Sequence, residues 1–148
     1  LGFRTSVLEI SENTTTHLPK VSVNYELELK FDGGVDMVTQ DTSKGTQVEF
    51  PSGTQCGKIT MHNASLADDT VVSFDLLNAR INADSIVIVN HSSAGTSGAY
   101  QVNASNIRDP VGVTPGKCAI NVRNISGGPL SEAIVLTFAI ISLNFTLS

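Results

Sequence analysis

The sequence predicts an all-β protein, an antiparallel β-sandwich of jelly-roll type with eight or nine strands. Two observations carry this prediction. Residues 21–31 alternate between apolar and polar side chains without a break, which is typical of a strand with one buried face and one face in water. Shorter runs of strand-like sequence follow, separated by turn-forming residues, and no segment has the period of a helix.

Length and composition agree with one folded domain. The chain has 148 residues and a mass of 15.6 kDa, with 41% hydrophobic and only 16% charged residues. The net charge of −5 argues against a nucleic-acid partner, which would require clustered basic residues. The longest apolar run, 133–141, is about half the ~20 residues of a membrane helix, so we expect no membrane insertion.

We therefore expect a single β-sandwich domain over 1–148. Residues 1–20 would form an N-terminal arm and 142–148 a C-terminal extension. The chain begins with Leu1 rather than Met, so we expect a cut, a processed end or a piece of a longer protein.

The first long strand is expected over 21–31, where the turn residues Asp32-Gly33-Gly34 end it. Residues 85–90 are apolar on both faces, which predicts a central strand covered on both sides. Residues 35–46 and 91–98 are polar and are expected to be loops. The other expected strands cover 6–10, 47–50, 57–62, 71–78, 99–105, 118–123 and 133–147.

The last expected strand has apolar residues of both parities, so each of its faces needs a cover. One face would fill the sandwich. We expect the other to pack between subunits of a cyclic homotrimer. Its interface residues would be Ile141, Leu143, Phe145 and Leu147. The alternative is that another segment of the same chain, 21–31, covers this face.

The sequence contains no pattern that predicts an enzyme, a metal site or a cofactor. The histidines, His17, His62 and His91, have no ligand-type residue at metal-binding spacing. Asp32, Asp36 and Asp41 lack the spacing and the late Glu of a calcium loop, so turn formation is the better interpretation. The chain has neither a Gly-x-Ser-x-Gly nucleophile motif nor a phosphate-binding loop.

The two cysteines, Cys56 and Cys118, each lie at the start of an expected strand. They would form a disulfide if those strands were neighbours with Cα atoms within ~7 Å. The other interpretation is two free thiols that behave as small hydrophobic side chains.

Six asparagines lie in Asn-x-Ser/Thr motifs, where about two would be expected by chance from the Ser and Thr content. In a eukaryotic secretory pathway these motifs would accept glycans. The alternative is that polar strand faces and turns favour Asn, Ser and Thr together. The six residues are Asn13, Asn63, Asn90, Asn103, Asn124 and Asn144.

Several segments in order along the chain carry a resemblance to a known family. The most specific are G-x-I-T-M-x-N-A at 57–64 and N-x-S-x-G-x-L-S-E-A at 124–133, and VTQDTSK at 38–44 precedes them. Together with 72–74, 84–89 and 95–100, they make residues 38–141 similar to a domain of tailed-bacteriophage virion proteins, found at the carboxyl ends of fibre-like and other surface structural proteins. Residues 108–116 depart from the pattern, because the family usually has a shorter turn there.

The resemblance implies a non-enzymatic structural protein on the outer surface of a virion, in a homotrimer and without catalytic residues. We expect a capsid decoration or cement protein that contacts the major capsid protein. One alternative is the trimeric tip of a tail fibre, spike or needle, which would bind a receptor on the host surface. The six Asn-x-Ser/Thr motifs keep open a further alternative, a secreted eukaryotic trimeric jelly-roll module.

Overall fold

The computed structural model describes residues 9–12, 19–22, 35–50 and 54–142. The chain divides into two compact units, 1–30 and 31–148. In the first unit, β1 (Glu9–Glu12) pairs antiparallel with β2 (Pro19–Ser22). Most of the strand expected over 21–31 lies outside the described residues, and most of the expected arm and extension does too.

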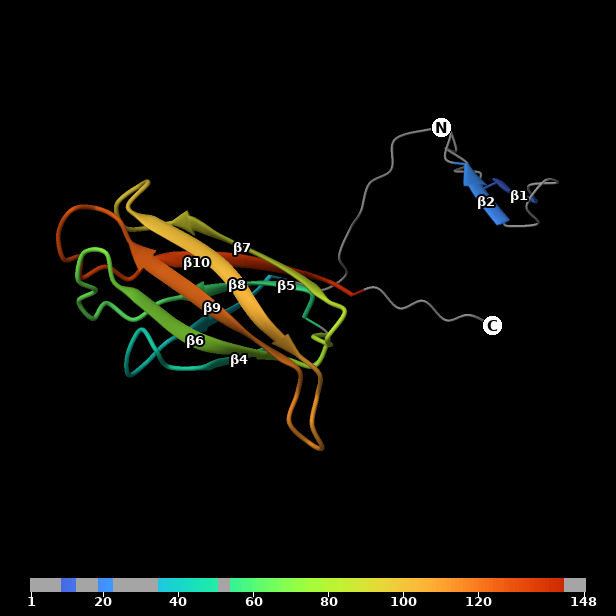
Figure 1. Ribbon diagram of the computed structural model, residues 1–148, viewed down its shortest axis with the longest axis horizontal. Helices are drawn as coiled ribbons and strands as arrows, with labels where there is room; N and C mark the ends of the chain where they lie inside the picture. Colours follow the sequence, from blue (N-terminus) through green and yellow to red (C-terminus); the bar gives the residue numbers. More distant parts are fainter. Residues whose placement is uncertain (1–8, 13–18, 23–34, 51–53, 143–148) are drawn as a thin grey trace, which may run out of the picture. The chain divides into compact units, whose positions relative to one another are not determined.

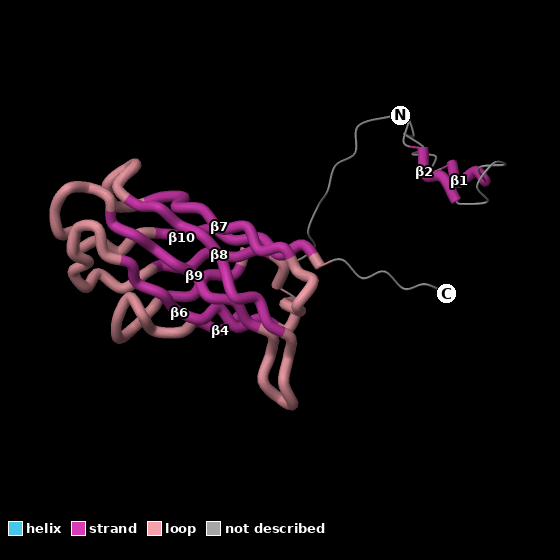
Figure 2. Tube along the Cα trace, in the orientation of Figure 1, coloured by secondary structure: helices cyan, strands magenta, loops and turns pink. Residues whose placement is uncertain are grey.

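The second unit is a sandwich of two four-stranded sheets, seen as two layers in Figures 1 and 2. Sheet I has the order β3-β5-β10-β7 and sheet II the order β4-β6-β9-β8. The strands of sheet I are β3 (Asp36–Thr39), β5 (Cys56–Thr60), β10 (Val135–Ile141) and β7 (Ile86–Ser93). Those of sheet II are β4 (Val48–Phe50), β6 (Val71–Asn78), β9 (Lys117–Asn124) and β8 (Tyr100–Arg108). The all-β sandwich expected from the sequence is confirmed.

Both sheets are mixed, so the expectation of a purely antiparallel sandwich was wrong. β3 pairs parallel with β5, and β4 pairs parallel with β6. The cause is the segment that holds β3 and β4, which adds one short strand to each sheet. Residues 35–46 were expected to be a loop, yet they contain β3. This strand has exposed Met37 and only a half-buried Val38, so it lacks the clear alternation that identifies a strand.

The core lies between the two sheets and is built from alternating residues of the paired strands. The rings of Phe50 and Phe138 meet edge to face with their centroids 4.7 Å apart. Gly57 lies against both rings, because a Cβ there would come within 2.7 Å of Phe50 and 2.8 Å of Phe138. The fully buried side chains include Ile59, Leu76, Ile120, Val122, Leu136 and Ile140.

The expectation that residues 85–90 form a central, doubly covered strand was wrong. Among the described strands, β7 is bonded only to β10, so it lies at the edge of sheet I. Val89 is buried in the core, whereas Ile86 and Ile88 on the opposite face are 49% and 48% exposed. The run of four apolar residues therefore reflects an uncovered outer face rather than two covered faces.

A hairpin at the β8–β9 connection stands out from the sandwich (Figure 1). It covers 109–116, between β8 and β9. Val111 and Val113 at its tip are 76% and 103% exposed.

Candidate functional site

The histidines and aspartates that the sequence analysis weighed and set aside as metal ligands have structural partners where the structure describes them. His62 Nδ1 accepts a hydrogen bond from the Ala64 N–H, and His91 Nε2 lies 2.6 Å from the Ala94 carbonyl oxygen. Asp36 accepts a hydrogen bond from Thr54, and Asp41 accepts one from Thr42. Over 35–50 and 54–142, no three His, Cys, Asp or Glu side chains lie close enough to hold a metal ion. His17 and Asp32 lie outside the described residues.

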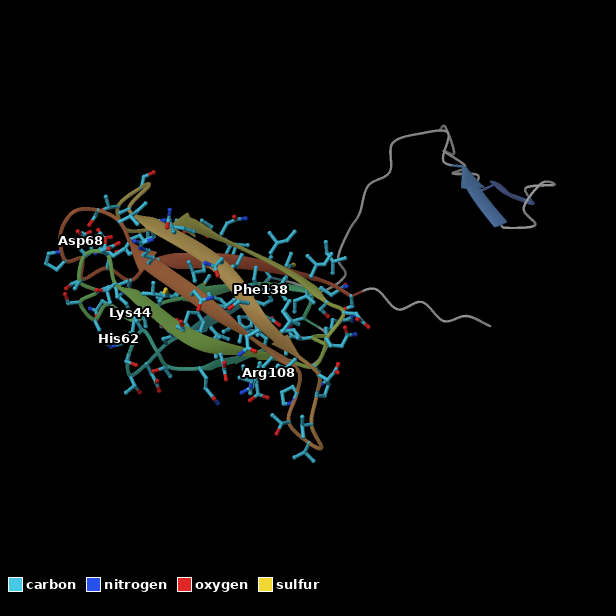
Figure 3. All side chains as sticks on the ribbon, in the orientation of Figure 1. Lys44, His62, Asp68, Arg108 and Phe138 are labelled. Carbon is cyan, nitrogen blue, oxygen red and sulfur yellow. The ribbon has the colours of Figure 1, made fainter. Side chains whose placement is uncertain are left out.

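Segments 38–44, 57–64 and 124–133 meet at one end of the sandwich. Figure 3 shows Lys44, His62 and Asp68 there, with Arg108 toward the other end, near the base of the hairpin. Lys44 is 4% exposed and donates hydrogen bonds to the carbonyl oxygens of His62 (2.5 Å) and Glu132 (2.6 Å). Lys44 therefore links segment 38–44 to segments 57–64 and 124–133.

Gln40 and Asn124 connect the same segments in the same way. Gln40 donates to the carbonyl oxygens of Lys44 and Thr46 and accepts from the His62 N–H. Asn124 is fully buried and donates to the carbonyl oxygens of Leu66 and Gly128. Because buried backbone groups need partners, these side chains hold the loops in place. Sequence reasoning missed them, since nothing in a sequence marks which polar residue will be buried.

Glu132 is the most heavily hydrogen-bonded carboxylate in the described part of the chain. It accepts hydrogen bonds from the Thr96 N–H (2.9 Å), the Thr96 hydroxyl (2.7 Å) and the Tyr100 hydroxyl (2.8 Å). The bonds from Thr96, followed by the bond from Tyr100, lower the pKa of Glu132. Burial and the bond to Glu132 raise the pKa of Tyr100. Burial lowers the pKa of Lys44, and the negative charge of Glu132 offsets part of this shift.

We expect Glu132→Gln to lower the thermal midpoint at pH 7 by a few degrees, because an amide is a weaker acceptor for three donors. The folded-state pKa of Glu132 lies below its unfolded value of about 4.5. Its contribution to stability is thus present above that pH and is lost as the pH falls through the folded-state pKa. Thermal scans from pH 7 to pH 3 should show the gap to wild type closing. A difference in thermal midpoint that stays the same at pH 3 would contradict this prediction. Glu49→Gln is the control, because Glu49 is exposed. A decrease in its midpoint equal to that of Glu132→Gln would also contradict the prediction.

The two cysteines are free thiols, so the possible disulfide between them is not formed. Cys56 lies on β5 of sheet I and alternates with buried Gly57, so it faces outward and is only half-buried. Cys118 lies on β9 of sheet II and is fully buried in the core, where burial raises the pKa of its thiol to about 12. The two side chains are on different sheets and face different environments.

The outer face of sheet I carries an apolar patch made of Cys56, Ile86, Ile88, Ala139 and Ile141, which we call the sheet I patch. In the strand register Ile141 lies opposite Ile86, and Ala139 lies between Ile88 and Cys56. Ile141 is 38% exposed, so this member of the expected subunit interface is available to a partner. Leu143, Phe145 and Leu147, the other expected interface residues, lie outside the described residues.

The outer face of sheet II has the opposite chemistry. Asn121, on β9, lies between Ser73 on β6 and Asn103 on β8. Asn121 accepts from the Ser73 hydroxyl (2.7 Å) and donates to Asn103 and Ser105 (both 2.9 Å). Lys117 on β9 pairs with Asp75 on β6, and Arg123 on β9 pairs with Asp69 in the turn before β6. This polar lattice is exposed and is held together by its own hydrogen bonds.

Two shallow hollows in the described surface are lined largely by polar groups. One, of about 320 Å³, is lined by Gly45, Gln47, Ser73, Phe74, Asp75 and Ala119. The other, of about 310 Å³, lies between β7 and β8 and is lined by residues that include Asn90, His91, Ser97 and Tyr100. Neither brings a nucleophile, a base and a group that orients the base together.

The Asn-x-Ser/Thr motifs differ in accessibility. Asn63, Asn90 and Asn103 are exposed, whereas Asn124 is fully buried with its amide hydrogen-bonded to backbone carbonyls. A glycan on Asn124 would require that part of the fold to open. Asn13 and Asn144 lie outside the described residues.

Over 35–50 and 54–142 there is no helix that is long and apolar enough to cross a membrane. None of the family models, curated proteins or solved structures with which the chain was compared matches it.

Proposed function

We propose that the chain is a non-enzymatic structural protein of a virion surface, a decoration or cement protein that binds the outside of a capsid as a homotrimer. The resemblance of residues 38–141 to phage virion proteins supports this proposal. The observation that carries it is the contrast between the two outer faces: sheet I bears the sheet I patch of exposed apolar side chains beside polar residues, whereas sheet II bears the polar lattice. An exposed apolar face favours burial against another protein surface, while a polar face can remain in water.

The sheet I patch is where a second copy would pack. The isoleucines of the patch are 38–49% exposed, so burial of the remaining surface of each would contribute about 1 kcal/mol to association. The apolar residues that follow in the sequence have the same parity as Ile141 and would enlarge the interface (Leu143, Phe145 and Leu147). The jelly-roll type of sandwich is part of the same proposal, although the parallel β3–β5 and β4–β6 pairs depart from an all-antiparallel jelly roll.

The trimer is tested first by light scattering on a sizing column. We expect a mass near three times 15.6 kDa, and we expect Ile86→Ser combined with Ile141→Ser to give monomer. Val71→Ser is the matched control, because Val71 is a comparably exposed residue on sheet II. A wild-type monomer, or a trimer that survives the double substitution, would rule out this interface.

The native cysteines report on the same interface. Cys56 belongs to the sheet I patch, so we expect its thiol to react slowly with a maleimide in the trimer and rapidly in the double variant. Cys118 is buried in both and serves as the internal control. Rapid labelling of Cys56 in the wild-type trimer would show that the subunits do not contact one another through the sheet I patch.

The capsid assignment is tested by adding the purified protein to emptied, expanded capsids that lack it. We expect saturable binding and a higher unfolding temperature of the shell. Absence of binding would exclude the decoration function.

The polar lattice of sheet II favours a second candidate, the tip of a tail fibre, spike or needle. These amides and hydroxyls are already ordered by their mutual hydrogen bonds. They would therefore lose little conformational entropy on binding a polar host receptor. This candidate predicts a trimer that resists SDS without heating, and loss of host-cell binding in Asn121→Ala. An SDS-sensitive trimer that binds capsids would exclude it.

A further inference from the structure

Exposed apolar side chains lie along both edges of sheet I. At the β7 edge, Ile86 and Ile88 are 49% and 48% exposed on the outer face. At the opposite edge, Val35 directly before β3 is 56% exposed and Met37 within β3 is 62% exposed. Met37 lies opposite Lys58, so it also belongs to the outer face. Sheet I therefore has two separate apolar surfaces, one at each edge strand.

The edges of the two sheets differ in how they are protected against pairing with another chain. Natural edge strands are often very short, charged or interrupted by a bulge. Both edges of sheet II have such features, because β4 has three residues and includes exposed Glu49, and β8 has a register shift near its end. In contrast, β7 pairs regularly from Ile86 to His91 and contains no Lys, Arg, Asp, Glu or Pro. At the β3 edge the carboxylate of Asp36 is already hydrogen-bonded to Thr54.

One row of outward-facing residues crosses all four strands of sheet I and is entirely apolar. Ala139 lies between Ile88 and Cys56 in the strand register. Continuing the β3–β5 register by one residue places Val35 beside Cys56. The row therefore runs from Val35 at one edge to Ile88 at the other, and both of its ends are exposed.

We propose that the β7 edge of one copy packs beside the β3 edge of the next copy, so that three copies form a closed ring. This contact rests on the proposed homotrimer and adds which surfaces join its subunits. Two different apolar edges on one sheet fit a heterologous contact, in which each copy uses one surface for each neighbour. A two-fold dimer would use the same edge in both copies and leave the other edge exposed.

The width of sheet I favours a ring of three copies. Neighbouring strands lie about 4.8 Å apart, so the four strands make each side of the ring about 19 Å wide. In a triangle of that size the axis lies about 5.5 Å from each sheet, close to half of the ~10 Å between packed sheets. Side chains of the three outer faces would therefore fill the centre. Four copies would place each sheet about 10 Å from the axis and leave a channel.

The strand directions agree with such a ring. Within one copy β3 and β7 run in the same direction, because β3 is parallel to β5, and β5 and β7 are both antiparallel to β10. Rotation about an axis along the strands preserves this direction, so Ile88 would lie beside Val35 of the next copy in a parallel pair. Ile86 and Ile141 would form a second apolar layer around the axis. Lys58 lies one row away in the opposite direction, where the polar half of the face opens to water.

The test is disulfide cross-linking of the full chain carrying Cys56→Ser, with copper phenanthroline as the oxidant. Within one copy Val35 and Ile88 are about 14 Å apart, whereas a disulfide needs Cα atoms within ~7 Å. We therefore expect Val35→Cys/Ile88→Cys to give a covalent trimer after heating in SDS without reductant, and each single substitution to give monomer. Met37→Cys/Ile88→Cys, offset by two residues, should cross-link less completely. Val71→Cys/Ile88→Cys is the matched control and should give no covalent trimer, because Val71 lies on sheet II.

Light scattering before oxidation separates the possible failures. A wild-type monomer would overturn the proposed trimer and the edge contact together. A trimeric Val35→Cys/Ile88→Cys that forms no covalent species would overturn the edge contact alone. Covalent dimers from Ile88→Cys alone would show a two-fold contact between β7 strands and would also overturn it.

A second measurement covers the case in which the double variant does not assemble. Val35→Cys and Ile88→Cys, each with Cys56→Ser, are co-expressed as two chains, so each copy keeps one native edge. We expect covalent dimers that contain one chain of each kind. Their absence from an assembled trimer would overturn the edge contact.

Discussion

Replacing Gly116 with alanine is expected to lower the free energy of unfolding by about 3 kcal/mol or more. A Cβ at this position would lie 1.8 Å from the carbonyl oxygen of Ile81 and 2.7 Å from its carbonyl carbon. Both atoms belong to the backbone, so no side-chain rotation can relieve the overlap. The chain would have to separate at the base of the hairpin and lose the bond between the Asn78 N–H and the Gly116 carbonyl. Urea unfolding measures the loss.

Gly128→Ala is the matched control for this substitution. Nothing lies within 4 Å of a Cβ at Gly128, and its backbone is not in the left-handed region. We expect its free energy of unfolding to stay within about 0.5 kcal/mol of wild type. Equal stability of Gly116→Ala and Gly128→Ala would show that the loop containing Ile81 is not held against β9.

Replacing Lys44 with methionine is expected to cost about 2–4 kcal/mol of stability. Methionine keeps most of the side-chain volume and removes the ammonium that donates to the His62 and Glu132 carbonyl oxygens. Those two partly buried carbonyl groups would then lack this donor. The loss is partly offset, because a buried ammonium is itself costly to desolvate. The measurement is again urea unfolding at pH 7.

Lys58→Met is the control, because Lys58 lies half-buried on the outer face of sheet I and can reach solvent. We expect its effect to stay within about 0.5 kcal/mol. A neutral Lys44→Met would mean that the ammonium is not needed to join the loops, and that segments 38–44, 57–64 and 124–133 are held together by packing and the remaining hydrogen bonds.

The buried polar residues of segments 38–44 and 124–133 therefore have a structural role. Lys44, Gln40 and Asn124 satisfy buried carbonyl groups from segments far apart in the sequence. Surface function would then depend on the residues outside this framework, namely the sheet I patch, the two edges of sheet I and the polar lattice of sheet II. This separation allows the framework and the binding surfaces to be tested with different substitutions.

Some strands could be predicted almost to the residue. β6 matches its predicted range, and β9 differs by one residue at each end, because β9 and most of β6 alternate between core and outer face. β7 and β8 extend further than predicted, since their ends carry polar residues on the outer surface. β3 was missed because its short edge pairing depends on backbone hydrogen bonds that no side-chain pattern records.

Side-chain alternation is a local property, so the sequence alone was sufficient for the all-β class, the positions of most strands and the turns between them. Strand neighbours, sheet edges and buried polar groups depend on contacts between residues far apart in the chain. The three-dimensional arrangement therefore decided the parallel pairs, the exposed edge at β7, the separation of Cys56 from Cys118 and the burial of Lys44. It also decided that Val111 and Val113 stand clear of the core, because a valine in a sequence looks the same whether a fold covers it or not.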